Sequence, residues 1–326
     1  YGTMNKLLKI LIFIVTTSFI SSHLYSSEVV RLENKIFDNS IFKPSKNEIL
    51  EWIKNEGNEQ YWYGVYQGNE KIGWAVKKSK TYQSDIFNQP IFEENFELNL
   101  TRKESGNDGK FFVSNIKISI KEIYEANATF KLLKHHTNIQ FDDTETSIFS
   151  EVSGVNYKVK YKNNNEKNSS EILLENLDYS LYDFLAIYTW IANNTKKIND
   201  VVSYITFDFK ELKYFLSEHT IQEVTKKKVS GVDFTYYKVN SVERAEIEEE
   251  NFSSQSLVNQ DGKEINFSVN DFELRLETEK NAKNTELVSD VFVDSGIVVE
   301  NNFPPDFYDK NSSMVTYEVI GDASSI

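Results

Sequence analysis

Cysteine is absent from this chain of 326 residues, and proline (four), histidine (four) and glycine (12) are scarce. Without cysteine the chain has no disulfide, thiolate metal site, cysteine nucleophile or lipidated cysteine. Basic residues are also in deficit, with 36 against 50 acidic ones, and the net charge of -14 repels phosphate backbones. We therefore expect no nucleic-acid partner. Hydrophobic residues make up 40% of the chain and aromatic residues 14%, enough to fill a substantial core.

Long apolar runs are missing except near the start. From Met4 the sequence reads MNKLLKILIFIVTTSFISSHLYSSE, with two early lysines, an apolar run over 10–20 and small residues after it, which is the layout of a secretory signal. The run is shorter than the roughly 20 residues that cross a bilayer. We expect a signal peptide region over 1–27, with 1–3 an upstream remnant, and no membrane span after cleavage; a retained anchor is the alternative. This predicts a periplasmic or secreted protein of a Gram-negative bacterium.

The residues after the signal predict one short helix and then a hairpin. Residues 28–57 form an N-terminal segment in which Ser45 can cap a helix, Gly57 can end it, and one face is apolar (Ile49, Trp52 and Ile53). The next stretch, YWYGVYQGNEKIGWAVKKSKTYQ, holds two aromatic and β-branched runs joined by a turn at Gly68–Asn69, which is typical of a β-hairpin.

Most of the remaining chain alternates between apolar and polar residues, as antiparallel strands with one solvated face do. The runs are 96–102, 111–124, 128–141, 156–162, 201–209, 219–231, 232–248, 253–269, 272–280 and 290–300. Asp261–Gly262 is a good hairpin turn, and apolar residues at helical spacing over 178–194 predict a single short helix that covers one end or face of the sheet.

These patterns predict a mainly β fold of antiparallel meander or curved sheets with one or two short helices, preceded by a signal-peptide helix. The antiparallel β domain is expected over 58–326, and a division into two sub-halves near 163–200 stays open. The order of elements has no βαβ alternation, which disfavours a parallel doubly wound sheet.

No catalytic, cofactor-binding or metal-ligating residue is predicted, and no cofactor. His23 lies beside the signal, and the adjacent His135 and His136 would point to opposite faces of a strand and could not share a metal. His219 stands alone in the sequence. We expect surface or loop histidines here rather than metal ligands. No serine lies in a GxSxG motif.

Clustered charges and aromatic residues each allow a functional and a structural interpretation. The glutamates at 246 and 248–250 and the pair Asp142–Asp143 lack the spacing of a calcium loop, so solvated charge is favoured. Lys226–Lys228 is expected to guard an exposed strand edge. An aromatic set near the hairpin could pack a core or line an apolar pocket, with two members on one face and one on the other (Tyr61, Trp62, Tyr63, Tyr66 and Trp74).

Three stretches resemble the N-terminal β domain of bacterial transglutaminase-like (cysteine-protease-fold) envelope proteins. The hairpin YWYGVYQGNEKIGWA (61–75) is similar to the one that opens that domain, and LVNQDGKEINFSVNDFELRLETEKNAK (257–283) is similar to its later hairpin. The segment NNFPPDFYDKNSSMVTYEVIGD (301–322) resembles the linker and strand before the catalytic core. The resemblance implies a chain that ends before a Cys-His-Asp core.

Two functions follow as hypotheses. The first is a non-catalytic periplasmic β domain that accompanies a transglutaminase-like peptidase or amidase core, with that C-terminal catalytic domain or another envelope protein as partner. The second is a free-standing periplasmic binding module for an apolar ligand such as a lipid or acyl chain. An independent hydrolase acting through carboxylates is disfavoured because no constellation supports it. Whether the parent protein is a cysteine hydrolase stays open.

Overall fold

The computed structural model describes residues 28–31, 41–105, 111–127, 129–142, 144–153, 155–163, 170–229, 232–244 and 252–284. Several predicted features lie outside these residues: the signal region, His23, the glutamates over 246–250, the strand over 290–300 and the segment 301–322. They stay predictions.

The described chain forms one sheet built from two meanders. The first meander runs β2 (Gln60–Gln67), β3 (Glu70–Ser84), β4 (Gln89–Ser105), β5 (Phe111–Glu125), β6 (Leu132–Phe141), β7 (Thr144–Ser153), β8 (Asn156–Asn163) and β9 (Ser170–Glu175). The second runs β10 (Val201–Asp208), β11 (Lys213–Val229), β12 (Val232–Arg244), β13 (Phe252–Asn259), β14 (Glu264–Val269) and β15 (Phe272–Glu277). Neighbouring strands from β2 to β15 are antiparallel, and a short β1 (Glu28–Arg31) pairs in parallel with β9. The predicted fold class, mainly β and antiparallel, is confirmed.

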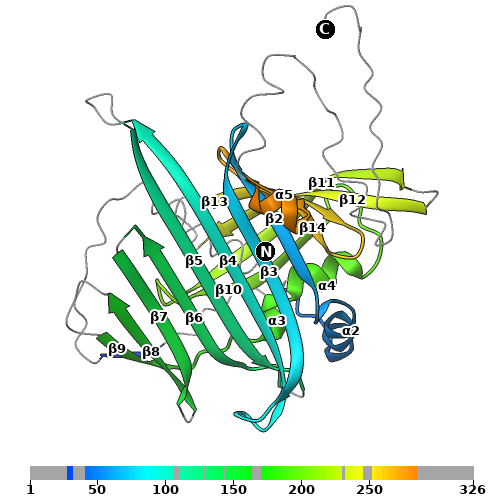
Figure 1. The fold of residues 1–326 in the computed structure, drawn as a ribbon. Coiled ribbons are helices and arrows are strands. Elements are labelled where there is room, and N and C mark those ends of the chain that lie inside the picture. The colour runs from blue at the N-terminus through cyan, green and yellow to red at the C-terminus, as the bar shows by residue number, and fades with distance from the viewer. Residues whose placement is uncertain are drawn as a thin grey trace, which may run out of the picture.

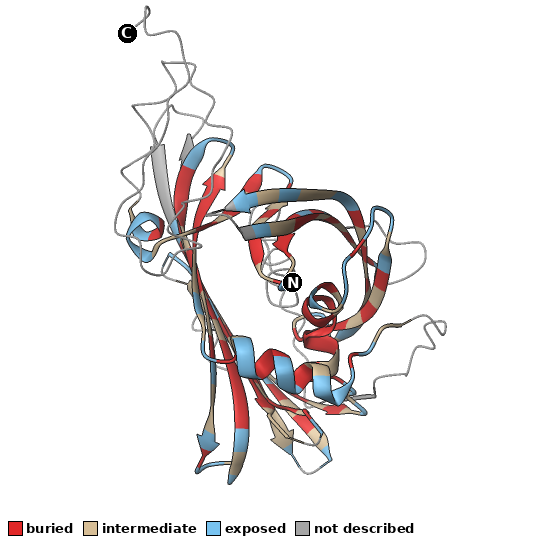
Figure 2. Ribbon diagram, turned by 90° about the vertical axis from the view of Figure 1, so that its right-hand side faces the viewer, coloured by how far each residue is buried: buried red, intermediate tan, exposed pale blue. Residues whose placement is uncertain are grey.

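The two meanders join where the first strand of one meets the last strand of the other. β2 pairs with β15 over six positions, from Gln67 opposite Phe272 to Trp62 opposite Glu277. We call this pairing of β2 with β15 the seam. The strand order of the sheet begins at β1 and β9, passes through the seam in the middle, and ends at β10. Figure 1 shows the long strands of the first meander crossing those of the second, and Figure 2 shows the sheet curling round. The chain passes from one meander to the other through α3 (Leu181–Phe184) and α4 (Ala186–Ala192).

Two apolar clusters fill the inside of the curve. The helix cluster joins α2 (Lys46–Glu56), α3 and α4 to strands of both meanders, whereas the sheet cluster joins β2–β5 directly to β12, β14 and β15. Both clusters lie on the same face of a strand: on β4, Phe92 belongs to the helix cluster and Phe96 to the sheet cluster. The inside of the molecule thus has a helical end and an end where sheet packs on sheet.

The predicted helix at residues 45–57 is confirmed. Ser45 and Glu48 form a reciprocal capping box, and Gly57 donates its N–H to the carbonyl of Ile53. Its apolar face is buried, as the spacing predicts.

The single helix predicted over 178–194 is instead two short ones. Leu185 takes a bridge-region backbone (φ -92°, ψ 2°) and ends α3 before α4 begins, a change of direction that lets both segments bury almost every apolar side chain. A fourth short helix, α5 (Glu279–Lys283), follows β15 and was not predicted. The described residues contain no helix with the length and apolar character needed to cross a membrane.

Candidate functional site

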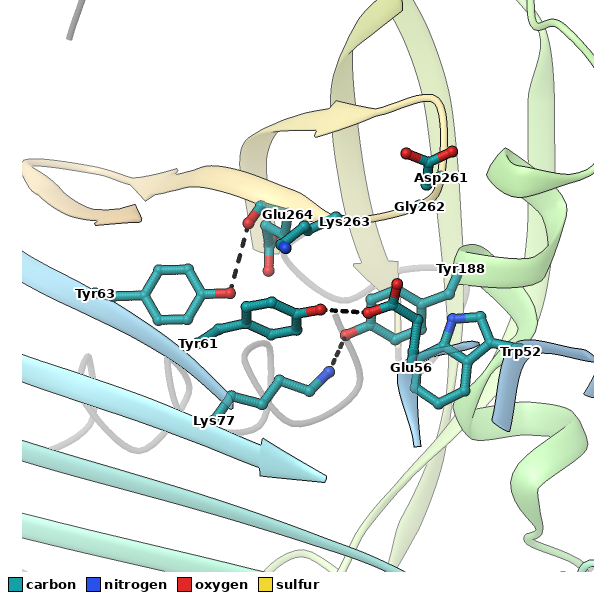
Figure 3. A pocket seen from close by; sticks show the side chains of 10 residues that line it. All are labelled: Trp52, Glu56, Tyr61, Tyr63, Lys77, Tyr188, Asp261, Gly262, Lys263 and Glu264. Atoms are coloured by element: carbon teal, nitrogen blue, oxygen red, sulfur yellow. Dashed lines mark hydrogen bonds between the residues drawn. The ribbon is translucent and has the colours of Figure 1, made fainter. Parts of the chain in front are cut away.

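A pocket opens between the helical end of the molecule and the turn that joins β13 to β14. Its empty space is about 350 Å³ when the adjoining open solvent is counted, and the part that the centre of a water molecule can occupy is about 20 Å³. Figure 3 shows its lining side chains, which come from α2, β2, β3, α4 and the turn. They are Trp52, Glu56, Tyr61, Tyr63, Lys77, Tyr188, Asp261, Gly262, Lys263 and Glu264.

Aromatic rings form two sides of the pocket. Alternation on β2 brings Tyr61 and Tyr63 to the same face, and α2 and α4 contribute Trp52 and Tyr188, whose ring centres lie 5.8 Å apart. The Tyr61 hydroxyl donates to a Glu56 carboxylate oxygen. The rings therefore present apolar faces to the pocket while their polar ends are held.

The floor of the pocket is the ammonium group of Lys77, whose side chain is 12% exposed. Lys77 Nζ lies 3.3 Å from a Glu94 carboxylate oxygen and donates to the Tyr188 hydroxyl at 3.1 Å. It also lies 4.5 Å from the centre of the Tyr188 ring, a cation–π distance. This amine has a fixed position because three contacts from β4 and α4 hold it.

Carboxylates dominate the rim and the wall opposite Lys77. Burial raises the pKa of Asp261, and the neighbouring Glu56 raises it further because two like charges repel. Burial also raises the pKa of Glu264, although Ser256 donates to its carboxylate at 2.8 Å. Lys263 Nζ lies 4.1 Å from the centre of the Tyr61 ring.

The turn that carries Asp261 and Lys263 depends on a glycine. Gly262 has a φ of +80°, and a Cβ at this position would lie 2.7 Å from the Tyr188 carbonyl oxygen. The Asn259 side chain accepts from the backbone N–H groups of Asp261 and Lys263, which completes the turn. The predicted Asp261–Gly262 hairpin is confirmed, and its glycine lets the turn approach α4 closely enough to close the pocket.

The histidine predictions are partly corrected. His136 is exposed and points away from the buried His135, as their adjacency predicts. However, His135 (2% exposed) and His219 (0%) are interior residues and not surface or loop residues. Each sits at an inward position of a strand that is paired on both sides, and sequence alone cannot distinguish an inward position from an outward one. No metal-binding group of His, Cys, Asp or Glu occurs among the described residues.

The aromatic set near the hairpin divides between two faces. Tyr61 and Tyr63 line the pocket, whereas Trp62 and Trp74 pair on the opposite face with ring centres 5.5 Å apart. Tyr66 lies on the same face as Trp62, because the bulge in the pairing of β2 with β3 adds its extra residue, Ile72, to β3. The Tyr66 hydroxyl donates at 2.5 Å to Glu277 of β15.

The other charged candidates have structural positions. Asp142 accepts from the backbone N–H of Asn115 at 2.8 Å and thereby extends the pairing of β5 with β6 by one residue. Asp143 lies outside the described residues. The pairing of β11 with β10 ends at Thr220, whereas its pairing with β12 continues to Val229. Lys226–Lys228 lies in the part of β11 beyond Thr220, which has a neighbouring strand on one side only in the described sheet.

The pocket residues that sequence reasoning missed come from distant parts of the chain. Glu56, Lys77, Tyr188 and Glu264 are ordinary members of a helix or a strand in the sequence. The sequence held no signal for Glu264, which alternates in phase with the polar Asn266 and Ser268 and is buried only because a bulge between Leu257 and Val258 places it opposite Val258.

The structure places the first two stretches of the transglutaminase-like resemblance next to each other. Residues 61–75 form β2 and β3, residues 257–283 form the end of β13 through α5, and β2 pairs with β15. The third stretch lies outside the described residues.

Comparison with known proteins gives one structural similarity to report. No family model matches the chain, and no curated protein matches it. The chain is similar to a crystal structure of a beta-barrel-like protein of a domain of unknown function, DUF1849, from Brucella abortus. That similarity covers 67% of this chain and 94% of the other, with a TM-score of 0.43 and 8% sequence identity. A similarity at this level carries no information about ligand or activity.

Proposed function

We propose that this protein is a binding module of the bacterial envelope that takes a small ligand with an ammonium group on a ring-shaped body, an amino sugar being the simplest example. The observation that carries the proposal is the lining of the pocket, in which aromatic rings alternate with an excess of carboxylates. Glu56, Asp261 and Glu264 face two lysines, and one of these, Lys77, already pairs with Glu94.

The ring faces and the charges favour different parts of such a ligand. Aromatic faces such as that of Trp52 pack against the flat apolar side of a ring, and they attract a cation through their quadrupole. The carboxylates of Glu56 and Asp261 repel each other across the rim of the pocket, and a positive charge placed between them would reduce this repulsion. A purely apolar acyl chain would desolvate these carboxylates without offsetting their negative charge, at a cost on the order of several kcal/mol.

The test is titration calorimetry of the mature protein with chitobiose, which carries two amines, and with N,N′-diacetylchitobiose, which has the same rings without charge. We expect measurable binding of chitobiose and at least about tenfold weaker binding of the acetylated sugar, since one charge-assisted hydrogen bond is worth about 1.5–3 kcal/mol. The variant Glu56→Gln with Asp261→Asn should weaken chitobiose binding about tenfold or more.

The matched control is Glu51→Gln, which removes an exposed carboxylate of the same helix outside the pocket. Equal binding of both sugars, or an equal loss from the Glu51 and Glu56 variants, would contradict the proposal. Uptake of palmitate without uptake of chitobiose would favour the apolar ligand instead.

A second candidate is the accessory β domain of a transglutaminase-like enzyme. It is favoured by the adjacency of the two resembling stretches, which together form the seam between the meanders. Reading the coding DNA past the codon for Ile326 tests it: a continuing frame with a cysteine and a downstream histidine supports it, and an immediate stop contradicts it.

A further inference from the structure

Two ammonium groups line the pocket, and they are held in different ways. Lys77 projects from the middle of β3 at the floor, where its side chain is 12% exposed and contacts Glu94 and Tyr188. Lys263 belongs to the turn between β13 and β14, and the residue is half-buried. The first amine is therefore part of the pocket wall, whereas the second lies at the end of a long side chain that reaches in from a turn.

The Lys263 ammonium lies on an aromatic ring of the pocket. Its Nζ is 4.1 Å from the centre of the Tyr61 ring, well inside the roughly 6 Å within which a ring face attracts a cation. Figure 3 shows the end of this side chain beside the ring, whose hydroxyl donates to Glu56. The hydrogen bond to Glu56 restrains the ring, so a cation meets a preformed surface there.

The carboxylates at the rim respond to the same amine. Burial and repulsion by Glu56 both raise the pKa of Asp261, and the positive charge of Lys263 counteracts this rise. Lys263 thus already reduces the repulsion between the two carboxylates. A ligand ammonium that is to reduce it in the same way must lie close to the place where this amine lies.

The pocket has little room for a second cation while Lys263 is in place. The part that the centre of a water molecule can occupy is about 20 Å³, and about 10–15 Å³ is needed for one water. Lys77 at the floor is itself a cation and repels another one there. Displacement of the Lys263 side chain both enlarges the pocket and vacates the ring face.

The turn can release this side chain without changing its own shape. The Asn259 side chain accepts from the backbone N–H of Lys263, and Gly262 takes the left-handed conformation that brings the turn close to Tyr188. Neither of these contacts involves the Lys263 ammonium. Rotation about the side-chain torsions of Lys263 therefore moves the amine and leaves the pocket wall in place.

We infer that the Lys263 ammonium marks the subsite for the ligand's ammonium and competes with the ligand for it. This inference rests on the proposed function. In the free protein the amine lies over the Tyr61 ring; on binding it moves out, and the ligand's ammonium takes its place over the ring and near Glu56 and Asp261. The measured affinity is then lower than the intrinsic affinity by the fraction of molecules in which the subsite is vacant.

Removal of the competing amine should therefore tighten binding. In titration calorimetry we expect Lys263→Met to bind chitobiose about tenfold more tightly than the wild type does, as if Lys263 occupied the subsite in about nine molecules of ten. Lys263→Arg keeps a competing cation that stacks on aromatic rings, and it should not show this gain. N,N′-diacetylchitobiose has no cation to place in the subsite, so its affinity should not rise in Lys263→Met.

Lys54→Met is the matched control, because it removes the same charge from an exposed position of α2 outside the pocket. It should leave the affinity for chitobiose unchanged. The gain in Lys263→Met should also persist in about 0.5 M sodium chloride, since salt screens the long-range attraction of a cation by an acidic protein but not the competition of two cations for one place. Circular dichroism verifies that each variant is folded, and Lys263→Gln replaces the methionine variant if it is not.

The outcomes separate the two inferences. Equal chitobiose affinities of the wild type and Lys263→Met, or a weaker one for the variant, overturn the competition and leave the proposed function standing. A gain for both sugars alike, or an equal gain in Lys54→Met, also overturns the competition, because neither depends on a shared cation subsite. Absence of chitobiose binding by both the wild type and Lys263→Met overturns the proposed function as well.

Discussion

His219 is held from both sides of its ring. Its Nε2 lies 2.9 Å from the Tyr204 hydroxyl, its Nδ1 lies 2.6 Å from Ser241 Oγ, and its ring stacks on Tyr204 with centres 5.1 Å apart. Burial lowers the pKa of His219 from its ordinary 6.5 to about 3, because a charged imidazolium would lose its hydration. The folded protein therefore stabilises the neutral form of the His219 ring.

This burial predicts acid sensitivity. Between pH 6.5 and 3 the unfolded chain binds a proton at residue 219 and the folded chain does not, so stability is full above pH 6.5 and falls as the pH drops. We expect the wild type to lose on the order of 2–3 kcal/mol more than His219→Gln between pH 7 and pH 4 in urea unfolding. The exposed His136→Gln is the control, and equal slopes for wild type and His219→Gln would contradict the prediction.

At the scale of elements, the two tight hairpins of the sheet use glycine for different reasons. Gly68, between β2 and β3, has a φ of +58° and nothing within 4 Å of a Cβ placed there. Gly262, between β13 and β14, has a φ of +80° and faces the carbonyl of Tyr188. Only the second turn is packed against a helix, and only that turn lines the pocket.

The pair of glycines makes a matched test. Gly68→Ala should cost about 1 kcal/mol, the strain of a left-handed backbone alone. Gly262→Ala adds a backbone clash and should cost clearly more, about 2–4 kcal/mol, and weaken chitobiose binding because the turn moves away from α4. Thermal unfolding measures the first effect and calorimetry the second; similar costs at both positions would refute the reasoning.

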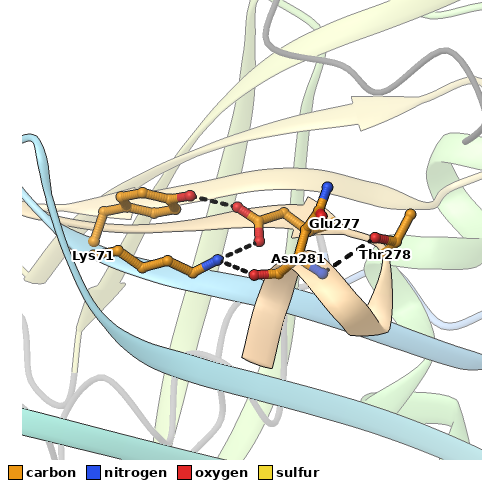
Figure 4. Close-up of polar contacts among 5 residues, drawn as sticks. Lys71, Glu277, Thr278 and Asn281 are labelled. Atoms are coloured by element: carbon orange, nitrogen blue, oxygen red, sulfur yellow. Dashed lines mark hydrogen bonds and ion pairs between the residues drawn. The ribbon is translucent and has the colours of Figure 1, made fainter. Parts of the chain in front are cut away.

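For the molecule as a whole, the seam is the backbone pairing that connects the first meander to the second within one sheet. Lys71 of β3 donates at 2.6 Å to Glu277 of β15 and also to the carbonyl of Asn281 in α5, as Figure 4 shows. The side chains are only 3% and 12% exposed, so this ion pair is largely desolvated. The contact fastens α5 to the seam.

A double-mutant cycle tests this fastening. Lys71→Met and Glu277→Gln should each cost about 2–4 kcal/mol, and the double variant less than their sum, since removing one partner leaves the other buried and unpaired. The pair Lys158–Glu171, at 2.6 Å with side chains 34% and 46% exposed, is the control and should couple by under about 1 kcal/mol. Equal coupling in both pairs would contradict the argument.

Local patterns in the sequence were enough for features that one segment decides. The capped helix from Ser45 to Gly57, the Asp261–Gly262 turn and the opposite faces of His135 and His136 follow from backbone preferences and the two-residue period of strands. β7 and β9 were missed because their Thr, Ser and Glu residues hide the apolar alternation.

Tertiary structure alone decided the pocket and which polar side chains lie inside the sheet. The pocket joins Glu56, Lys77, Tyr188 and Glu264, which are far apart in the chain, through the seam of β2 with β15 and the position of α4. An alternating strand pattern says which residues share a face but not which face is inside, and the interior place of Glu94 or His219 depends on strands paired from both meanders. The sequence by itself determined a mainly antiparallel β protein with a capped helix and its turns, because those rest on local energies, while the site rests on contacts that exist only once the sheet has curled.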